Sequence, residues 1–501
     1  MMYISTRDNF REVTASTAIR LGMVPKGGLF VPARIPVLPD AWVTLFPRLS
    51  YQEKAVYLLT LYLEDYLPEE IKECVDQAYN GANFQHQDIT PLEKLEDDLY
   101  VLELWHGPTA AFKDLALQIM PHLLSLAVKK GGQDRETVIL VATSGDTGKA
   151  ALEGFKDVPG IQIIVFYPGQ GVSKVQELQM TTTTGRNTHV VAVQGNFDDC
   201  QNAVKEIFAD EAFNSKLKKA GYDLSSANSI NWGRLVPQIV YYFAAYGDLV
   251  TRGEIKAGSR VNIVVPTGNF GNILAGWYGA RMGLPVHRFI CASNENKVLT
   301  DFFQTGIYNR NRPFKRTSSP SMDILISSNL ERFLFEITSH DAEKIRYWME
   351  NLSLQGGFTV DKATRSSMDG IMEAGYATEE ETLTTIGETF RATGYTLDPH
   401  TAVGKKVYQD YRDRTGDQTP TILAATASPF KFNASVMRAL KGDAAVEGYT
   451  EFEILGELAR VAGLSVHPGL AGLECRLVLH GGACASTGLR AQIEEILLHS
   501  K

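Results

Sequence analysis

Short apolar runs rich in Val, Ile and Leu recur between about residues 99 and 425, and most are followed by a helical pattern. The runs show little polar alternation, which predicts strands buried on both faces and hence a parallel sheet covered by helices. In such sheets ligands bind beyond the carboxyl ends of the strands. The loops after these runs are therefore the places to search for chemistry. The predicted strands are Tyr100–Leu104, Thr137–Val141, Ile161–Phe166, His189–Val193, Arg260–Val265, Arg288–Cys291 and Thr421–Ala425.

The two ends of the chain follow other patterns. Lys26–Gly28 predicts a turn into a short extended segment, and residues 52–66 have the apolar spacing of a helix with one buried face. After a Gly- and Asp-rich stretch at 441–449, Phe452–Val461 and Leu489–Leu498 are candidate helices. Neither end carries a motif that indicates chemistry by itself.

Composition excludes several classes of protein. A chain of 501 residues with 44% hydrophobic and 21% charged residues is not disordered, and its length predicts two or three domains. The net charge of −9 argues against a nucleic-acid partner. The five cysteines form no C-x-x-C pair, so we expect neither a structural metal nor a disulfide framework. Without an apolar leader or a run of about 18 apolar residues, we expect a cytoplasmic protein with no membrane partner.

The loop after the first predicted strand contains Lys113 just where a helical pattern begins. At a helix start the dipole disfavours the ammonium form, and a lysine with a lowered pKa can serve as a nucleophilic amine. A solvated lysine is the ordinary alternative. Asp114 fits first-turn dipole compensation better than acid catalysis, and His106 fits a structural role.

Two further loops have small residues after a strand. Thr143–Lys149, which includes Ser144, Asp146 and Thr147, could open backbone N–H groups to an anion at a helix start. It is not a P-loop, because its glycines are too close, and a tight turn is the alternative. Pro266–Asn272 places Gly268, Asn269, Phe270, Gly271 and Asn272 where a phosphate could be held, although Gly-Asn pairs are also common in turns.

Two other segments supply polar side chains. Thr426 follows the last predicted strand, and its hydroxyl could donate to a ring nitrogen or cap the next segment. The segment 228–234 is dense in hydrogen-bonding groups, namely Asn228, Ser229, Asn231 and Arg234. The alternative there is a capped helix start with Arg234 at the surface.

Together these motifs resemble the threonine synthase family, in the branch found in bacteria and fungi, within the fold-type II pyridoxal-phosphate enzymes. The resemblance runs from Tyr3–Arg7 to Ala425–Phe432 and so covers most of the chain. The motifs that carry it are Gly27–Pro32, His106–Thr109, Phe112–Asp114, Ser144–Gly148, Tyr167-Pro168, Val172-Ser173, Gln176, Gln179-Met180, Asn228–Arg234 and Gly268–Gly271.

The resemblance implies a two-lobed α/β fold with parallel sheets, similar to the tryptophan synthase β subunit. We expect residues 1–93 to form a mixed α/β flanking domain and residues 94–435 the cofactor-binding core. A smaller α/β lobe is expected at about 135–225 within that core. Residues 436–501 are expected to form a helical or mixed segment packed on it.

The family also implies roles for single residues. Lys113 matches the lysine that carries pyridoxal 5'-phosphate in a Schiff base and moves protons during the reaction. The loop 268–272 matches the cofactor-phosphate loop, and Thr426 matches the hydroxyl that faces the pyridine nitrogen. Ser144, Asp146 and Thr147 lie where the substrate carboxylate is bound. Asn228, Ser229, Asn231 and Arg234 are our candidates for the substrate phosphate, because a guanidinium binds phosphate bidentately.

The implied substrate is O-phospho-L-homoserine, and the implied products are L-threonine and inorganic phosphate, formed by γ-elimination and β-hydration. A threonine-synthase-like phospho-lyase that releases 2-oxobutyrate would use the same lysine and loops, so the motifs do not separate the two. A catalytically silent relative is expected to have lost Lys113 or the phosphate loop, and both are present. Whether the protein is a monomer or a homodimer stays open.

Overall fold

The computed structural model describes residues 1–132, 135–143, 145–169 and 172–499. In this part of the chain two large sheets hold the core, one of six strands in the order β14-β11-β10-β15-β5-β4 and one of five in the order β16-β8-β7-β6-β9. All neighbouring strands pair in parallel except β4 and β5. The expected two-lobed, parallel-sheet α/β class is therefore confirmed. The strands are β4 (Leu92–Glu96), β5 (Leu99–Glu103), β6 (Glu136–Ala142), β7 (Ile161–Pro168), β8 (Thr188–Gln194), β9 (Tyr222–Ser225), β10 (Val261–Pro266), β11 (Val286–Ser293), β14 (Met372–Tyr376), β15 (Thr421–Ala425) and β16 (Gly482–Ala485).

The larger sheet is buried on both faces, as its apolar runs predict. Along β10, Val264 packs in a cluster with Val403 of helix α19 (Pro399–Thr415), whereas Ile263 and Val265 belong to the main cluster on the other face. That face is covered by helices α12 (Gln238–Thr251) and α13 (Gly271–Met282). Successive strand residues point to opposite faces, so an almost continuous apolar run is required.

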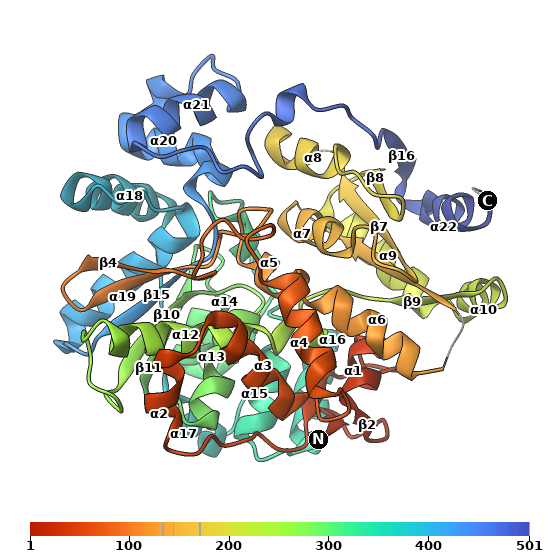
Figure 1. Cartoon of the computed structure of the whole chain (residues 1–501), viewed down its shortest axis with the longest axis horizontal. Coiled ribbons are helices and arrows are strands. Elements are labelled where there is room, and N and C mark those ends of the chain that lie inside the picture. Colours follow the sequence, from red (N-terminus) through yellow and green to blue (C-terminus); the bar gives the residue numbers. More distant parts are fainter. Residues whose placement is uncertain (133–134, 144, 170–171, 500–501) are drawn as a thin grey trace.

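The smaller sheet repeats this arrangement on the right of Figure 1. Val138 and Leu140 of β6 share a cluster with residues of α9 (Phe197–Ala209) and α10 (Glu211–Lys219), while Ile139 and Val141 face the side of α7 (Asp146–Phe155). Helix α5 (Lys113–Leu117) lies between the two sheets. The ends of strands from both lobes therefore converge on this helix.

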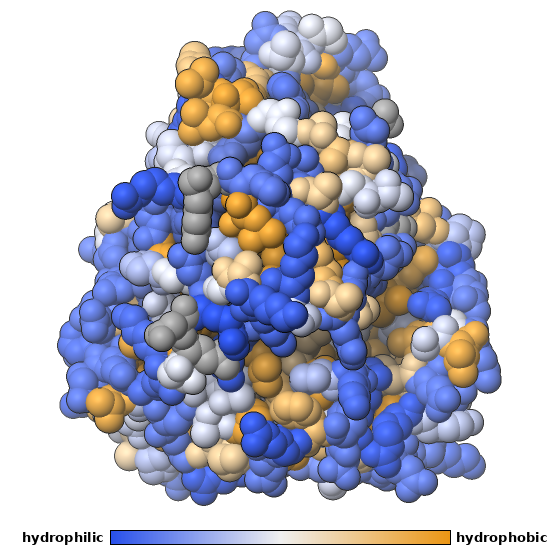
Figure 2. All heavy atoms as spheres, turned by 90° about the vertical axis from the view of Figure 1, so that its right-hand side faces the viewer, coloured by the Kyte–Doolittle hydropathy of each residue, from blue (hydrophilic) through white to orange (hydrophobic). Residues whose placement is uncertain are grey.

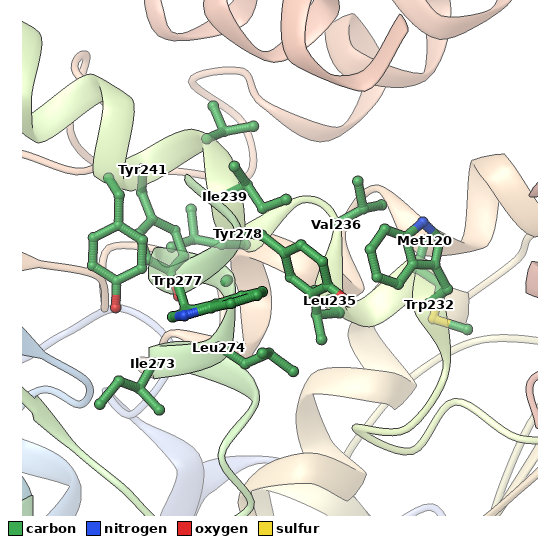
Figure 3. Packing of buried hydrophobic residues seen from close by; sticks show 14 of the residues in the cluster. Met120, Trp232, Leu235, Val236, Ile239, Tyr241, Ile273, Leu274, Trp277 and Tyr278 are labelled. Atoms are coloured by element: carbon green, nitrogen blue, oxygen red, sulfur yellow. The ribbon is translucent and has the colours of Figure 1, made fainter. Parts of the chain in front are cut away.

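The N-terminal segment shares the core of the larger lobe. Its small antiparallel sheet has the order β2-β1-β3, and the ring of Trp232 packs edge-on against Tyr3 of β1 and against Tyr278, with centroids 5.4 Å apart in both pairs. Figure 3 shows Trp232 beside Leu235, Val236 and Tyr278. The elements here are β1 (Met2–Ser5), β2 (Val13–Thr14), β3 (Phe30–Pro32), α1 (Ala15–Leu21), α2 (Trp42–Leu45), α3 (Tyr51–Tyr62), α4 (Pro68–Ala78) and α11 (Trp232–Leu235).

Two predicted helices differ from the structure. The helix expected over 52–66 ends at Tyr62, and Pro68 begins the next helix, a position that suits its fixed φ and missing N–H. The helical pattern after Phe112 is divided into α5 and α6 (Met120–Lys130), with Pro121 in the first turn of the second. The consequence is that Lys113 lies on a helix of five residues.

The C-terminal segment bridges the two lobes. Helices α20 (Asn433–Lys441) and α21 (Glu451–Ala462) lie above the larger sheet, and the chain then crosses to β16, which pairs with β8, and to α22 (Leu489–Glu494) (Figure 1). Both helices predicted after residue 450 are confirmed, the second continuing as a π-helical turn at Glu495–His499. The other elements are α8 (Lys174–Thr181), α14 (Val298–Thr305), β12 (Ile307–Asn309), α15 (Leu330–Ile337), α16 (Ala342–Leu354), β13 (Gly357–Thr359), α17 (Lys362–Asp369) and α18 (Glu379–Thr393).

All seven predicted strands are present, and the short extended segment expected after Lys26–Gly28 is β3. The edge strands β4, β9, β14 and β16 and the other short strands were missed. Among the described residues, no helix is long and apolar enough to span a bilayer. The face shown in Figure 2 is largely hydrophilic, with hydrophobic residues in small separate groups. Such scattered apolar residues are usual on a protein surface.

Candidate active site

Lys113 is the first residue of α5, and its side chain is only 13% exposed. The ammonium Nζ lies 3.4 Å from the hydroxyl of Ser321 and 3.5 Å from Oδ2 of Asp146. Burial lowers the pKa of Lys113, and the positive charges of Lys431 and Arg234 lower it further, while Asp146 acts against them. The pKa of Lys113 is thus shifted in the direction expected for a nucleophilic amine. The main cause of the shift is burial, whereas the sequence had pointed to the helix dipole.

The loop that presents Lys113 is fixed by Asp114. This carboxylate is fully buried and accepts hydrogen bonds from the Thr109 amide at 2.8 Å and the Thr109 hydroxyl at 2.7 Å. Burial raises the pKa of Asp114 to about 6. A Cβ at Gly107 would overlap the Asp114 side chain, so the turn requires glycine. Asp114 therefore has a structural role, as the sequence indicated.

The last strand of the larger sheet joins this loop. Thr426, which is buried, accepts a hydrogen bond from the Phe112 amide at 2.9 Å, and Ser428 donates its amide to Ala110. The fold thus brings Thr426 and Lys113 together across more than 300 positions of sequence. From the C-terminal segment, Gly469 packs so closely on the carbonyl of Pro108 that no side chain would fit.

The loop after β6 is organised around Asp146, the first residue of α7. Thr143 Oγ1 accepts hydrogen bonds from the amides of Gly145 at 3.0 Å and Gly148 at 2.9 Å, so part of this helix start is already capped. Thr147 is partly exposed, and Ser144 lies outside the described residues. The backbone here has fewer free donors than the sequence suggested.

The Asp146 carboxylate is shared among several donors. Its Oδ1 accepts from Gln176 at 2.9 Å and lies 3.1 Å from the Lys431 ammonium, and its Oδ2 accepts from the Ser321 hydroxyl at 3.0 Å. Burial alone would raise the pKa of Asp146, but Lys431 and Lys113 hold it well below its usual range. The carboxylate is therefore ionised and faces the lysine.

The loop after β10 has the features of a phosphate site. Helix α13 begins at Gly271 without a side-chain cap, after Phe270 in the left-handed region at φ 63°. Asn272 accepts hydrogen bonds from the hydroxyls of Tyr241 and Tyr242, while its own Nδ2 is buried and has no partner among the described residues. An uncapped helix start and a donor without an acceptor fit an anion.

The rest of this loop is held by the 327–329 segment. The carbonyl of Gly268 accepts a hydrogen bond from Ser327 at 2.7 Å, and Ser328 donates to the side chain of Asn269, which is exposed. A Cβ at Gly268 would lie 2.8 Å from the carbonyl oxygen of Ser321. Ser321, whose hydroxyl contacts Lys113, therefore also packs against the loop after β10.

The polar residues of the segment 228–234 differ in whether their hydrogen-bonding groups are already occupied. Asn231 is fully buried, donates to the carbonyls of Ile19 and Ser226, and accepts from the Gly233 amide, so its side chain maintains the local fold. Ser229 bonds to Ser328 at 3.2 Å, and Asn228 is partly exposed. The hydrogen-bonding groups of Asn231 are thus occupied by main chain, so its side chain is not open to the substrate contact expected from the sequence.

Arg234 is buried rather than at the surface. Its Nη1 donates to the Ala227 carbonyl, its Nε has no partner in the described ranges, and burial lowers its pKa to about 10. Its charge acts on Lys113. A buried guanidinium without a carboxylate partner is costly and fits an anionic ligand.

Sequence reasoning missed three groups at this site. Ser321 lies in a Ser-rich segment without a pattern, and His400, which bonds to Asp398 at 2.9 Å, accepts from the Ser321 amide at 3.2 Å. Lys431 lies inside the recognised 425–432 motif, but its charge is typical of a surface residue. No cluster of metal-ligating side chains occurs in the residues that the structure describes.

Comparisons with known proteins agree with this geometry. The family model described as pyridoxal-phosphate dependent enzyme matches residues 84–426. The models of the threonine synthase N terminus and of the threonine synthase C-terminal region match residues 2–79 and 401–462.

Similar proteins come from several kingdoms. Threonine synthase-like 1 of Homo sapiens is 43% identical over 458 residues, which are 88% of this chain and 61% of the human protein. The chain thus spans about three fifths of the length of that relative. Threonine synthase of Schizosaccharomyces pombe is 38% identical over 467 residues, 87% of this chain and 89% of the fungal enzyme.

Solved structures match along the whole chain. The crystal structure of threonine synthase from yeast aligns with a TM-score of 0.88 at 32% identity, covering 100% of this chain and 99% of that one. The pyridoxal-phosphate-bound threonine synthase from Brucella melitensis aligns with a TM-score of 0.85 at 35% identity and the same coverage. The chain therefore belongs to the threonine synthase family of pyridoxal-phosphate-dependent enzymes.

Proposed function

We propose that this enzyme is a threonine synthase, which converts O-phospho-L-homoserine and water to L-threonine and inorganic phosphate. The observation that carries the proposal is Arg234, a buried cation without a carboxylate partner among the described residues, whose charge reaches Lys113. A substrate with a phosphate on its side chain would supply the missing anion. The similarity to fungal and bacterial threonine synthases along nearly their full length supports the same substrate.

The cofactor would be held by three parts of the chain. Lys113 would attach it, the open start of α13 with Asn272 would bind its phosphate, and Thr426 would face its ring nitrogen. When bound, pyridoxal phosphate supplies the electron sink that stabilises negative charge on an amino-acid substrate. An uncharged hydroxyl partner keeps that sink weak, so the acid-base groups of the protein must contribute more.

The side chains around Lys113 would then move the protons. Burial lowers the pKa of Lys113, which favours the free amine that can accept a proton. Asp146, 3.5 Å from Nζ, stabilises the ammonium that results, and the Ser321 hydroxyl orients it. Burial of the site keeps water away from these charges and strengthens their interactions.

The substrate would be held at its two anionic ends. Arg234, with the partly exposed Asn228 and Ser229, would bind the phosphate. The remaining amides at the start of α7, with Thr147, would bind the carboxylate. Binding both ends of the substrate would hold the carbon between them near Lys113, in an orientation suited to the reaction.

The decisive variant is Arg234→Ala. We expect KM for phosphohomoserine to rise at least about 100-fold, as for loss of a charge-assisted bidentate contact, with the visible spectrum of the bound cofactor unchanged. Arg288→Ala, at a half-buried arginine that bonds to the carbonyls of Asp369 and Gly370, is the matched control. An unchanged KM would remove Arg234 from the substrate site.

A phospho-lyase that releases 2-oxobutyrate is the second candidate. The observation that favours it is the 42–43% identity to the primate threonine synthase-like 1 proteins, against 36–38% to the fungal and bacterial threonine synthases. Assaying the purified protein with phosphohomoserine for both products separates the two. Predominant 2-oxobutyrate would overturn the synthase assignment.

A further inference from the structure

Lys431 is the most deeply buried cation of the site. It lies on the short 3-10 helix Pro429–Phe432, and its side chain has no exposed surface. Its Nζ donates to the carbonyl of Thr109 at 2.8 Å and lies 3.1 Å from Oδ1 of Asp146. One ammonium thus joins the end of the larger sheet, the loop that presents Lys113, and the first helix of the smaller lobe.

The two lysines share one carboxylate. Lys431 contacts Oδ1 of Asp146, and Lys113 lies 3.5 Å from Oδ2. Each oxygen has a further donor, Gln176 on the first and Ser321 on the second. The carboxylate is therefore fixed in one orientation, and its charge is divided between the lysines.

A buried ion pair of this kind is weak evidence for a stabilising role. Desolvation of two charges often cancels their attraction, and apolar residues of the same volume do as well or better. The contact of Lys431 with Asp146, which also faces Lys113, is therefore more informative than any contribution to stability.

We propose that Lys431 is a positioning residue: by sharing Asp146 with Lys113, it keeps the Asp146 carboxylate aimed at the Lys113 nitrogen and takes up part of the carboxylate charge. The inference rests on the role of Lys113 in the proposed function, but not on whether threonine or 2-oxobutyrate is released. Within the described residues, Lys431 contacts Asp146 and the carbonyl of Thr109, but neither the Lys113 nitrogen nor Arg234. It acts on Lys113 through Asp146 and through the repulsion between the two like charges.

The charges around the pair determine the sign of the effect. Lys113 faces Asp146, Lys431 and Arg234, Asp146 also faces His400, and Lys431 acts on Asp114 and His467. Removing Lys431 deletes a like charge near Lys113 and takes away the second ammonium beside Asp146, so the carboxylate acts more strongly on Lys113. Both changes favour the protonated nitrogen, so its titration must move to higher pH.

The test is a pH titration of the full-length holoenzyme without substrate. The visible absorbance of the bound cofactor reports the proton on the Lys113 nitrogen, and in Lys431→Met its midpoint should rise by about one pH unit. The acid limb of the kcat profile should rise in the same direction. Lys431→Arg keeps the charge and should titrate near the wild-type midpoint.

Lys405→Met is the matched control for loss of a buried lysine. Lys405 is 3% exposed and pairs with Glu96 at 3.0 Å, away from the site, so its loss should leave the midpoint unchanged. A midpoint and an acid limb in Lys431→Met that both stay at the wild-type pH would overturn the proposal. So would an equal shift in Lys405→Met.

Asp146→Asn keeps the proposal testable if Lys431→Met does not fold. Here the carboxylate is lost and Lys431 stays, so the midpoint should fall, and a rise or no change would overturn the proposal. The product assay is independent of these measurements, because it asks only which compound is released. Failure of the proposed function and failure of this inference are thus distinguishable.

Discussion

The loop after β6 and the loop after β10 both lead from the carboxyl end of an interior parallel strand into the start of a helix. In the first, Thr143 occupies two amides and a buried carboxylate, Asp146, stands at the helix start. In the second, the helix start has no side-chain cap, and Nδ2 of Asn272 has no acceptor in the part of the chain that the structure describes. The first loop thus turns a carboxylate toward Lys113 and Lys431, whereas the second leaves its helix start and an amide donor open to an anion.

The difference shows that a glycine-rich turn before a helix does not by itself define a phosphate site. Both loops offer a helix dipole and small residues. What separates them is whether their donors are satisfied. Thr143 accepts two amides in the first loop, whereas Tyr241 and Tyr242 donate to the amide oxygen of Asn272 and leave its Nδ2 without an acceptor among the described residues. A few neighbouring side chains thus decide which charge each of the two loops favours.

The sharpest way to break this comparison is to give the second loop the charge of the first. Asn272→Asp would place a buried carboxylate where the cofactor phosphate is proposed to bind. We expect Kd for pyridoxal phosphate to rise at least about 100-fold, because like charges in a buried site cost several kcal/mol. Absorbance titration of the cofactor measures this.

Asn196→Asp is the control for Asn272→Asp. Asn196 caps helix α9, where a carboxylate is favourable, and no ligand is proposed there. Its cofactor affinity should equal that of the wild type. Tight cofactor binding by Asn272→Asp would show that the loop after β10 does not hold the phosphate.

Thr143→Val sharpens the comparison from the other side. The change keeps the shape but leaves the amides of Gly145 and Gly148 without their acceptor. We expect the free energy of unfolding in urea to fall by about 1–3 kcal/mol, the cost of burying unsatisfied donors. The Kd for the cofactor should change little, and a large increase would mean that this loop also binds its phosphate.

Gly268→Ala tests the close approach between the second loop and Ser321. The new Cβ would lie 2.8 Å from a backbone oxygen, so one segment must move. We expect cofactor Kd to rise about tenfold, equivalent to about 1.4 kcal/mol. In Gly456→Ala the added Cβ meets no described atom from outside its own helix backbone within 4 Å, so binding should be unchanged. Equal effects in both variants would contradict the role of the contact between Gly268 and Ser321.

Thr147→Val should have the smallest effect. Its partly exposed hydroxyl is proposed to add one hydrogen bond to the substrate carboxylate, so KM for phosphohomoserine should rise about fivefold, which corresponds to about 1 kcal/mol. Steady-state kinetics at fixed cofactor occupancy measure it. A wild-type KM would leave the carboxylate to the amides of α7 alone.

The strands and the main positions of the site followed from the sequence. Apolar runs such as 261–265 must be buried on both faces, which fixes a parallel sheet, and Lys113 at a helix start was recognisable from spacing. Edge strands such as β4 and β16 were missed because a strand with one exposed face has a weaker apolar pattern. Family resemblance then gave Lys113 a role that spacing alone left open.

What the sequence determined by itself is the set of local patterns: buried strands, turns at their ends, and the lysine among them. The tertiary structure decided which of the polar groups are already satisfied. Asn231 and Arg234 lie three positions apart, yet the hydrogen bonds of the first are made with main chain, whereas the second is a buried cation that meets no carboxylate within the described ranges. Likewise Ser321 and Lys431 reach Asp146 only when both lobes are assembled. The physical reason is that burial and pairing depend on distant segments, whereas turn and strand propensities depend on neighbours.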